Sequence, residues 1–495
     1  MIRWLSKYPL LTILALSALV RFGLWWAVRQ EPIHPGDEIH YHELAQSLVE
    51  GRGFFLEGRA SAMRPPLYPL AVAGLYELFG PGNFQAVRAV QLLLGLATAA
   101  GSFLLGRMLY DRRVGLWAAG LVAFYPPLLG IAVFLYTETL FAFWLVGLGM
   151  AGAWALRQKV VWPWLVVGLL LALAALTRSV LWPFVPVLAG LILLLWRQVG
   201  WDKRLVGAAL MLAGFIAVVA PWSWRCTRLE QTFIVIDTIG GRNLMMGNYE
   251  YTPLDRAWDA ISLEGEKAWY AVLRQEYPEF GALTQGQRDK LALRYALRYM
   301  MAHPGQTLQR SLVKFFNFWQ LERTTVAALE RGWFGGLGRA AVLAWTAVLC
   351  GSYAVAMLAA VAGLVLIPPA DRRTMLVLLS LIGFVCVVHT VVFAHSRYHL
   401  PLAPLELVFA GAVLAYWGRQ PKPIHSETSP GKIQPQPPGD KLGSSTPSAS
   451  EVAVGSRPKK WQYGLVVLCW LVLVAGWLWE ILWVDWPKVQ KILGG

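Results

Sequence analysis

Residues whose side chains could do chemistry stand at the ends of long apolar runs in this sequence. Adjacent carboxylates occur at Asp37 and Glu38, another at Glu138, and arginines at Arg64 and Arg397. A carboxylate can accept a proton from a hydroxyl or an amine, and arginines can stabilise negative charge that grows on a phosphate. These residue types suit the transfer of a group from a phosphate leaving group to a hydroxyl or amine acceptor.

Simpler explanations exist for several of these residues. Asp37 could be a helix N-cap, which is compatible with a role as a base because a capped carboxylate stays ionised. Arg64 could reach out to lipid headgroups. The cluster of His34, Asp37, His40 and His42 could hold a divalent metal, which stays an open alternative, although its spacing matches no known ligand set. The sequence contains no Walker-type loop, G-x-S-x-G or H-E-x-x-H motif that would indicate other chemistry.

The composition is that of a membrane protein. Of the 495 residues, 57% are hydrophobic and only 15% are charged, which excludes a soluble cytosolic globule. The net charge of +15 does not indicate a nucleic-acid partner, because the cations lie between apolar blocks. The four cysteines do not suggest a disulfide framework, since Cys350, Cys386 and Cys469 lie inside apolar runs.

About eleven transmembrane helices are predicted from apolar blocks long enough to cross about 30 Å of hydrocarbon, although residues 114–156 can be divided in more than one way. The predicted spans are about 8–28, 85–106, 114–132, 133–156, 161–177, 180–196, 205–224, 340–367, 374–394, 401–417 and 461–484. The first is expected to be an uncleaved anchor, because its apolar run is too long for a signal peptide. The fold class is therefore all-α and polytopic.

The distribution of charge predicts which side each segment faces. If the N-terminus is cytoplasmic, the segments predicted to be cytoplasmic carry most of the net positive charge, as the positive-inside rule requires. These segments are 1–7, 107–113, 157–160, 197–204, 368–373 and 418–460. Glu138, Arg178 and Arg397 then lie at outer span ends. We therefore expect an integral protein of the plasma (inner) membrane with its site on the extracytoplasmic side.

Two long segments lie outside the spans, and both are expected to contain helices. In the first, residues 29–84, apolar spacing after Asp37 predicts a short amphipathic helix that ends near Gly51, and prolines after Arg64 begin a second interfacial helix. The second, residues 225–339, is expected to be mostly helical, with patterns at about 255–277 and 286–302. It is large enough to cover the site and select acceptors.

The expected domain organisation follows these segments. A catalytic transmembrane module spans 1–224, an extracytoplasmic domain spans 225–339, and residues 340–417 complete the module. The Pro- and Ser-rich stretch 418–460 is expected to be a disordered cytoplasmic linker. Residues 461–495 form a final transmembrane helix and tail.

Over about residues 1–417 the sequence resembles the GT-C membrane glycosyltransferases, specifically glycosyltransferase family 39, which includes protein O-mannosyltransferases and aminoarabinose-to-lipid-A transferases. The motifs that carry the resemblance are Asp37-Glu38 with Gly51-Arg52-Gly53, Arg64-Pro65-Pro66-Leu67-Tyr68-Pro69, Tyr125-Pro126-Pro127 before Thr137-Glu138, Thr177-Arg178, Pro221-Trp222 with Gly240-Gly241-Arg242-Asn243 and Gly247-Asn248, and Arg397-Tyr398 with Pro401. Their order and their placement along the spans make the set specific.

The resemblance implies a GT-C fold and the transfer of a sugar, with inversion, from a polyprenyl-monophosphate donor to a protein, lipid or glycan. Asp37 would be the general base, and Glu38 would help to orient the acceptor. Glu138 falls on the second acidic position of the family. The residues implied in binding the donor phosphate or lipid are Arg64, Tyr68, Arg178, Arg397 and Tyr398. Such a donor makes a metal less necessary, because a phosphomonoester leaves readily once its charge is paired.

Two other functions remain open at this point. A ligase that moves a glycan from a polyprenyl-diphosphate donor would use the same residue types. A non-catalytic flippase or transporter of a lipid-linked sugar would instead be expected to carry ionisable groups near mid-bilayer and repeated halves, and neither pattern is evident.

Overall fold

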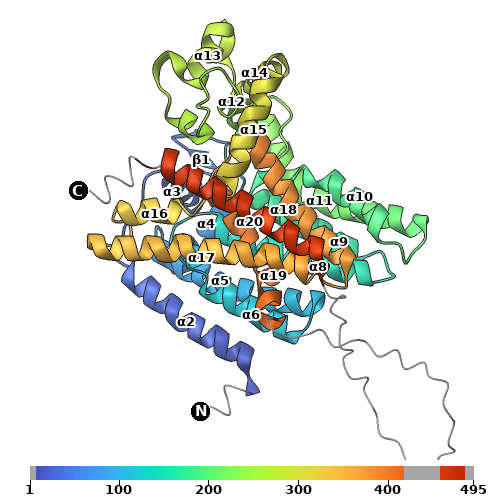
Figure 1. Ribbon diagram of the computed structural model, residues 1–495. Coiled ribbons are helices and arrows are strands. Elements are labelled where there is room, and N and C mark those ends of the chain that lie inside the picture. The colour runs from blue at the N-terminus through green and yellow to red at the C-terminus, as the bar shows by residue number, and fades with distance from the viewer. Residues whose placement is uncertain (1–6, 417–457, 485, 487–495) are drawn as a thin grey trace, which may run out of the picture.

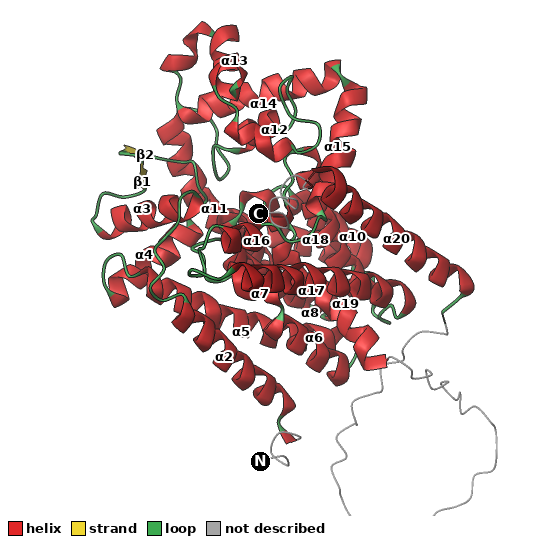
Figure 2. Cartoon of the chain, turned by 60° about the vertical axis from the view of Figure 1, so that its left-hand side comes forward, coloured by secondary structure: helices red, strands yellow, loops and turns green. Residues whose placement is uncertain are grey.

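The computed structural model describes residues 7–416, 458–484 and 486, and the regular secondary structure of these residues is helical except for one short hairpin (Figure 1 and Figure 2). Most of the predicted linker 418–460 and most of the tail after the last helix lie outside the described residues. The apolar helices of the first half are α2 (Pro9–Ala27), α5 (Phe84–Leu109), α6 (Arg112–Phe124), α7 (Pro126–Ile131), α8 (Glu138–Arg157), α9 (Pro163–Thr177), α10 (Phe184–Leu195) and α11 (Trp201–Glu230). Those of the second half are α17 (Arg339–Leu366), α18 (Arg372–Val391), α19 (Ala403–Tyr416) and α20 (Lys460–Trp479), which continues as a π-helix over Glu480–Val484.

Eight segments among the described residues are long and apolar enough to cross a membrane, which confirms an all-α integral membrane protein. The other three predicted spans correspond to shorter helices. The span predicted at 114–132 is divided at Tyr125 into α6 and α7, because Pro126 and Pro127 restrict the backbone there. The spans predicted at 161–177 and 180–196 become α9 and α10, which have 15 and 12 residues. The number of membrane crossings stays a prediction.

Small residues bring the helices of the bundle close together, as is common in membrane proteins. A β-carbon at Gly168 of α9 would lie 2.0 Å from the carbonyl oxygen of Met211 in α11. A β-carbon at Gly106 of α5 would lie 2.9 Å from the α-carbon of Gly115 in α6. The close crossings make the bundle a rigid support for the residues at its ends.

The first long segment folds as predicted into two helices, α3 (Asp37–Val49) and α4 (Leu67–Phe79), with an antiparallel hairpin of β1 (Phe55–Leu56) and β2 (Arg59–Ala60) between them. Tyr41 of α3 packs edge-on against Tyr68 of α4, with ring centroids 4.8 Å apart. Gly36, with φ of 108°, is the N-cap of α3, so Asp37 is the first helical residue. The N-cap explanation of Asp37 was therefore wrong, and its carboxylate is available for other contacts.

Most of the second long segment forms a helical unit at the top of Figure 1. The helices of this unit are α12 (Gly240–Met246), α13 (Trp269–Glu276), α14 (Gln285–Ala302) and α15 (Pro304–Phe318), and its 3₁₀ turns are Ala257–Ser262, Gly265–Lys267 and Pro278–Ala282. The last helix of the segment, α16 (Thr324–Glu330), lies lower, against α17 and α7. The helix expected at 286–302 is present as α14, whereas 255–277 contains two 3₁₀ turns before α13.

A buried lysine attaches this unit to the bundle. The Nζ atom of Lys314, in α15, donates to the carbonyl oxygen of Val391 at 2.7 Å and to Oδ1 of Asn248 at 3.0 Å. Val391 ends α18, only a few residues before Arg397. Burial, together with the charge of Arg310, lowers the pKa of Lys314 to about 7. These hydrogen bonds hold the unit against the end of the bundle that carries the arginine.

Candidate active site

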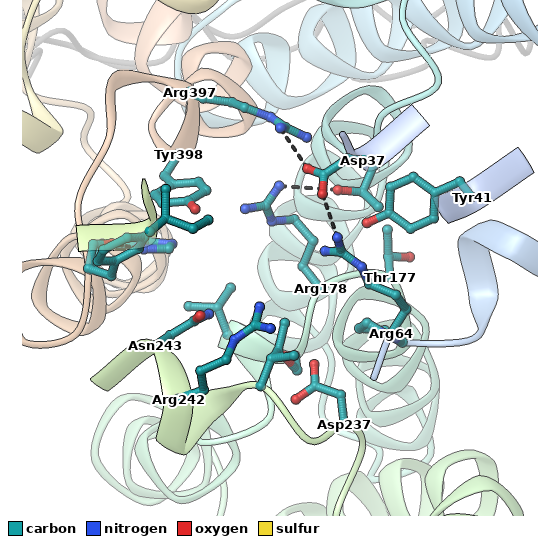
Figure 3. Close-up of a pocket in the computed structure, with 18 of the residues that line it drawn as sticks. Asp37, Tyr41, Arg64, Thr177, Arg178, Asp237, Arg242, Asn243, Arg397 and Tyr398 are labelled. Atoms are coloured by element: carbon teal, nitrogen blue, oxygen red, sulfur yellow. Dashed lines mark hydrogen bonds and ion pairs between the residues drawn. The ribbon is translucent and has the colours of Figure 1, made fainter. Parts of the chain in front are cut away.

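A cavity of about 180 Å³ lies where the bundle meets both long segments (Figure 3). Asp37 and Tyr41 of α3 line it on one side, and Arg397 and Tyr398 on another. The other lining residues are Arg64, Pro65, Thr137, Thr177, Arg178, Ser179, Val180, Asp237, Ile239, Arg242, Asn243, Trp258, Ile261, His389 and Phe393. Segments that are far apart in the sequence thus meet around one polar space.

Asp37 lies between two arginines at the edge of this cavity. The Nη2 atom of Arg64 donates to Oδ1 of Asp37 at 2.6 Å, and Nη1 of Arg397 donates to Oδ2 at 2.8 Å. Burial alone would raise the pKa of the Asp37 carboxyl. The charges and hydrogen bonds of the two arginines outweigh burial and hold this pKa well below its usual range. Asp37 is therefore ionised and firmly oriented at neutral pH.

Arg397 also binds a second carboxylate. Its Nε donates to Oε1 of Glu138 at 2.6 Å and its Nη2 to Oε2 at 3.1 Å, which is the forked geometry that only arginine provides. Nη1 of Arg178 donates to the same Oε1 at 2.6 Å and to Oγ1 of Thr137 at 3.1 Å. The result is an alternating row of charges, Arg64, Asp37, Arg397, Glu138 and Arg178, which we call the charge row.

The charge row lies in a desolvated setting. The side chain of Glu138 is fully buried, and those of Arg397, Arg178 and Arg64 are 12%, 15% and 15% exposed. The guanidinium of Arg397 also stacks over the ring of Tyr136, 3.7 Å from its centroid. Charges this far from water stay in place only when each is paired and hydrogen-bonded. Removal of one member of the row would therefore leave its neighbours unpaired.

The opposite wall carries polar residues to which the sequence analysis gave no role. Asp237 lies in the loop between α11 and α12, and Arg242 and Asn243 lie in α12 (Figure 3). Carboxylate oxygens of Asp289 accept from the backbone N–H groups of Gly241 and Arg242 at 3.0 and 2.8 Å and so hold the start of α12. The signal in the sequence was the polar Gly240-Gly241-Arg242-Asn243 motif in the segment that follows the predicted span 205–224.

Three predicted site residues do not line the cavity: Glu138, which is paired with Arg178 and Arg397, and Glu38 and Tyr68. Oε2 of Glu38 accepts from the backbone N–H of His34 at 2.8 Å, and Oε1 accepts from that of Leu135 at 2.6 Å, so Glu38 braces the loop before α8. The hydroxyl of Tyr68 donates to Oε1 of Gln91 at 2.7 Å and is buried. The roles predicted for Glu38 with the acceptor and Tyr68 with the donor gain no support from these positions.

The histidines of the first long segment do not gather into a metal site. Nδ1 of His34 lies 2.9 Å from Glu38, and Nδ1 of His42 lies 2.7 Å from the hydroxyl of Tyr76. Nδ1 of His40 lies 2.9 Å from Nη2 of Arg64. Within the described part of the chain, no group of three or more His, Cys, Asp or Glu residues could hold a metal ion. The hypothetical cluster is therefore spread over separate contacts.

The fold and the cavity define a membrane protein with a row of paired charges at one end of a helical bundle. Residues 63–224 match a family model described as dolichyl-phosphate-mannose-protein mannosyltransferase. An undecaprenyl phosphate-alpha-4-amino-4-deoxy-L-arabinose arabinosyl transferase of Pseudomonas aeruginosa (strain UCBPP-PA14) is 26% identical over 219 residues. The matched residues are 41% of this chain and 39% of that relative, so the match covers less than half of the relative's length. The resemblance predicted from the sequence is confirmed by these matches.

Two solved structures also align with this chain, each with a TM-score below 0.5. The archaeal oligosaccharyltransferase AglB from Archaeoglobus fulgidus, in complex with an inhibitory peptide and a dolichol-phosphate, has a TM-score of 0.47 and 13% identity, over 96% of this chain and 55% of that one. ArnT from Cupriavidus metallidurans, bound to undecaprenyl phosphate, has a TM-score of 0.39 and 14% identity, over 81% of this chain and 77% of that one.

Replacing Arg397 by leucine is expected to destabilise the protein strongly, because two carboxylates then lose a shared cation. Breaking a buried pair in this way costs about 3–5 kcal/mol. The matched control is Arg157→Leu, which removes a partly exposed arginine that lies 2.8 Å from Asp371 and should cost at most about 1 kcal/mol. Unfolding midpoints of the detergent-purified variants measure the difference, and equal losses in both variants would contradict the special role of Arg397.

Proposed function

We propose that this protein is an inverting glycosyltransferase that moves a sugar from a polyprenyl-monophosphate donor to a protein, lipid or glycan acceptor. The observation that carries the proposal is the carboxylate of Asp37, held between Arg64 and Arg397 at the edge of a polar cavity. The match of residues 63–224 to a family that is described by a lipid-phosphate sugar donor supports it.

The proposed reaction is a single displacement at the anomeric carbon. An acceptor hydroxyl or amine forms the new bond to this carbon while the bond to the phosphate oxygen breaks. Asp37 takes the acceptor's proton, and the polyprenyl phosphate leaves with the bonding electrons. Arg64, Arg178 and Arg397 stabilise the charge that grows on the phosphate. Tyr398, which lines the cavity under the guanidinium of Arg178, completes the proposed donor site.

The two arginines that orient Asp37 also make it a weak base. A carboxylate that accepts charged hydrogen bonds on both oxygens has little affinity for a proton. A donor phosphate would compete with Asp37 for Arg64 and Arg397 and thereby raise the pKa of this carboxyl. In this scheme the base gains strength only once the donor is bound, which limits proton uptake in the empty site.

Arg242 is the cation of the cavity best placed to receive the phosphate first. Within the described residues no carboxylate is within ion-pair distance of its guanidinium, and its Nε atom is buried without a hydrogen-bond partner. Burial and the nearby charge of Arg64 both lower the pKa of Arg242. A phosphate would relieve this unpaired charge at no cost to the charge row.

The proposed site faces the extracytoplasmic side of the plasma (inner) membrane, with the N-terminus in the cytoplasm. This orientation rests on the excess of Lys and Arg in the segments predicted to be cytoplasmic. It also suits a donor that is anchored in the membrane by its lipid. Residues 225–339, which cover the cavity from one side through Asp237 and α12, are proposed to select the acceptor.

Asp37→Asn is expected to lower the rate of sugar transfer by a factor of about 10² or more, because the amide cannot take up the proton. The assay uses purified protein in nanodiscs with a panel of polyprenyl-monophosphate and polyprenyl-diphosphate sugars, with and without a chelator. Asp259→Asn, an exposed aspartate near the cavity, is the matched control and should keep full activity. Undiminished transfer by Asp37→Asn would remove its assignment as the base. Transfer only from diphosphate donors would indicate the ligase.

Arg242→Ala is expected to weaken binding of the donor about 10- to 100-fold, because a charge-assisted hydrogen bond contributes about 1.5–3 kcal/mol. Binding of sugar-free polyprenyl phosphate to the variant in nanodiscs measures this loss. Arg288→Ala is the control, since the side chain of Arg288 donates to the carbonyl oxygens of Phe280 and Gly281, away from the cavity. Equal affinity in wild type and Arg242→Ala would exclude Arg242 from the phosphate site.

The proposed orientation predicts the reactivity of introduced cysteines. Arg59→Cys, in the exposed hairpin, should react with an impermeant thiol reagent in intact cells, and Lys203→Cys, at the start of α11, should react only after lysis. Wild-type protein gives the background from the native cysteines. The reverse pattern would overturn the proposed orientation.

A further inference from the structure

Asp237 is held in a fixed position on the wall of the cavity across from Asp37 (Figure 3). Its loop is tied to α11 by Trp222, whose Nε1 donates to the carbonyl oxygen of Ile236 at 2.8 Å. It is tied to the first long segment by the backbone N–H of Thr238, which donates to the carbonyl oxygen of Ala62 at 3.1 Å. The carboxyl group is thus presented to the cavity by a loop that is braced on both sides.

One oxygen of this carboxyl group lacks a partner. Oδ2 of Asp237 is buried and, within the described residues, has no hydrogen-bond partner. A buried polar atom left in this way costs roughly 1–3 kcal/mol, so it is expected to be paired when the site is occupied. Asp37 differs in this respect, because both of its oxygens already accept from arginines.

The environment of Asp237 also differs electrostatically from that of Asp37. Burial raises the pKa of Asp237 to about 7, although hydrogen bonds from Ser179 and from the backbone of Ile239 lower it in part. Near neutral pH this group can therefore either donate or accept a hydrogen bond. Two carboxyl groups whose environments drive their pKa values apart usually have different tasks.

The surroundings of Asp237 suit a small polar ring rather than a phosphate. Asn243 and the ring of Trp258 line the same cavity, which gives this wall one amide and one aromatic face. The ring of Trp258 is itself held by Phe393 and His395, with centroid distances of 4.9 Å to each. Aromatic faces and a few placed polar groups are what binding pockets for small molecules typically combine.

We propose that Asp237 binds a ring hydroxyl or ring amine of the sugar that is transferred, and so determines which donor sugars the protein accepts. This inference rests on the proposed function and adds a specificity residue to the same site. The arrangement places sugar recognition on the loop before α12 and phosphate recognition on the arginines, while Asp37 serves the acceptor. A site built to pair with a substrate hydroxyl strongly rejects analogues that lack it.

The test compares Asp237→Ala and Asp237→Asn with wild type, using the best donor sugar and a set of its monodeoxy analogues. For the best donor, Asp237→Ala should lower kcat/KM about 10- to 100-fold, which matches the loss of one hydrogen bond to a charged or polar partner. For the analogue that lacks the contacted group, wild type and Asp237→Ala should have equal kcat/KM. The substitution in the protein and the missing group on the sugar each remove the same interaction, so their effects do not add. Asp259→Asn is the control and should leave the donor profile unchanged.

Binding of sugar-free polyprenyl phosphate separates this role from a general loss of structure. The affinity for this lipid should differ less than about twofold between wild type and either variant, because in the proposal the phosphate does not contact Asp237. If Asp237→Ala does not fold, Asp237→Asn keeps the volume of the side chain and should still change the ranking of the donor sugars, because its NH2 group replaces one acceptor oxygen. An unchanged donor profile, or an equal loss for every donor and for sugar-free lipid, would overturn the inference. Wild-type protein that cleaves no donor would contradict the proposed function itself.

Discussion

The rest of the site depends on one guanidinium that two carboxylates share. Arg397 binds Asp37 through one nitrogen and Glu138 through two others, and it joins segments separated by 360 and 259 residues in the sequence. Arg64 and Arg178 close the row at either end. Each charge is buried enough to need its neighbours, so the helices that carry them must pack in one arrangement. The row therefore couples the packing of the bundle to the geometry of the cavity.

The cavity places two aspartates in opposite electrostatic settings. Arginines hold the pKa of Asp37 low, whereas burial raises that of Asp237 to about 7. A charged carboxylate suits a base that gains strength when phosphate draws the arginines away. A carboxyl that can donate as well as accept suits recognition of a sugar hydroxyl. Arg242 lines the same cavity, and in the described part of the chain it has no carboxylate partner. It is the residue proposed to receive the donor phosphate first. The roles proposed for the two aspartates therefore differ because their neighbours differ, although the residue type is the same.

Much of the architecture could be predicted because it follows from local patterns. Apolar length indicated the long spans, and helical spacing after Asp37 indicated α3. Charges at span ends singled out Arg178 and Arg397, and both line the cavity. Glu38 and Tyr68 do not line the cavity, and their roles stay predictions. A helix presents several faces, and spacing does not say which face meets the cavity. The side chains of Glu38 and Tyr68 instead hold neighbouring loops and helices together.

The sequence by itself determined that this chain is a helical membrane protein and that its ionisable residues collect at the ends of apolar helices. Both follow from the cost of placing charges in hydrocarbon, which is a property of composition and spacing. Only the tertiary structure decided which charges pair, that Asp37 and Glu138 share Arg397, and that Asp237 and Arg242 face them. Those partners belong to helices and loops far apart along the chain. Their distances are set by how the helices pack, and no local pattern encodes that packing.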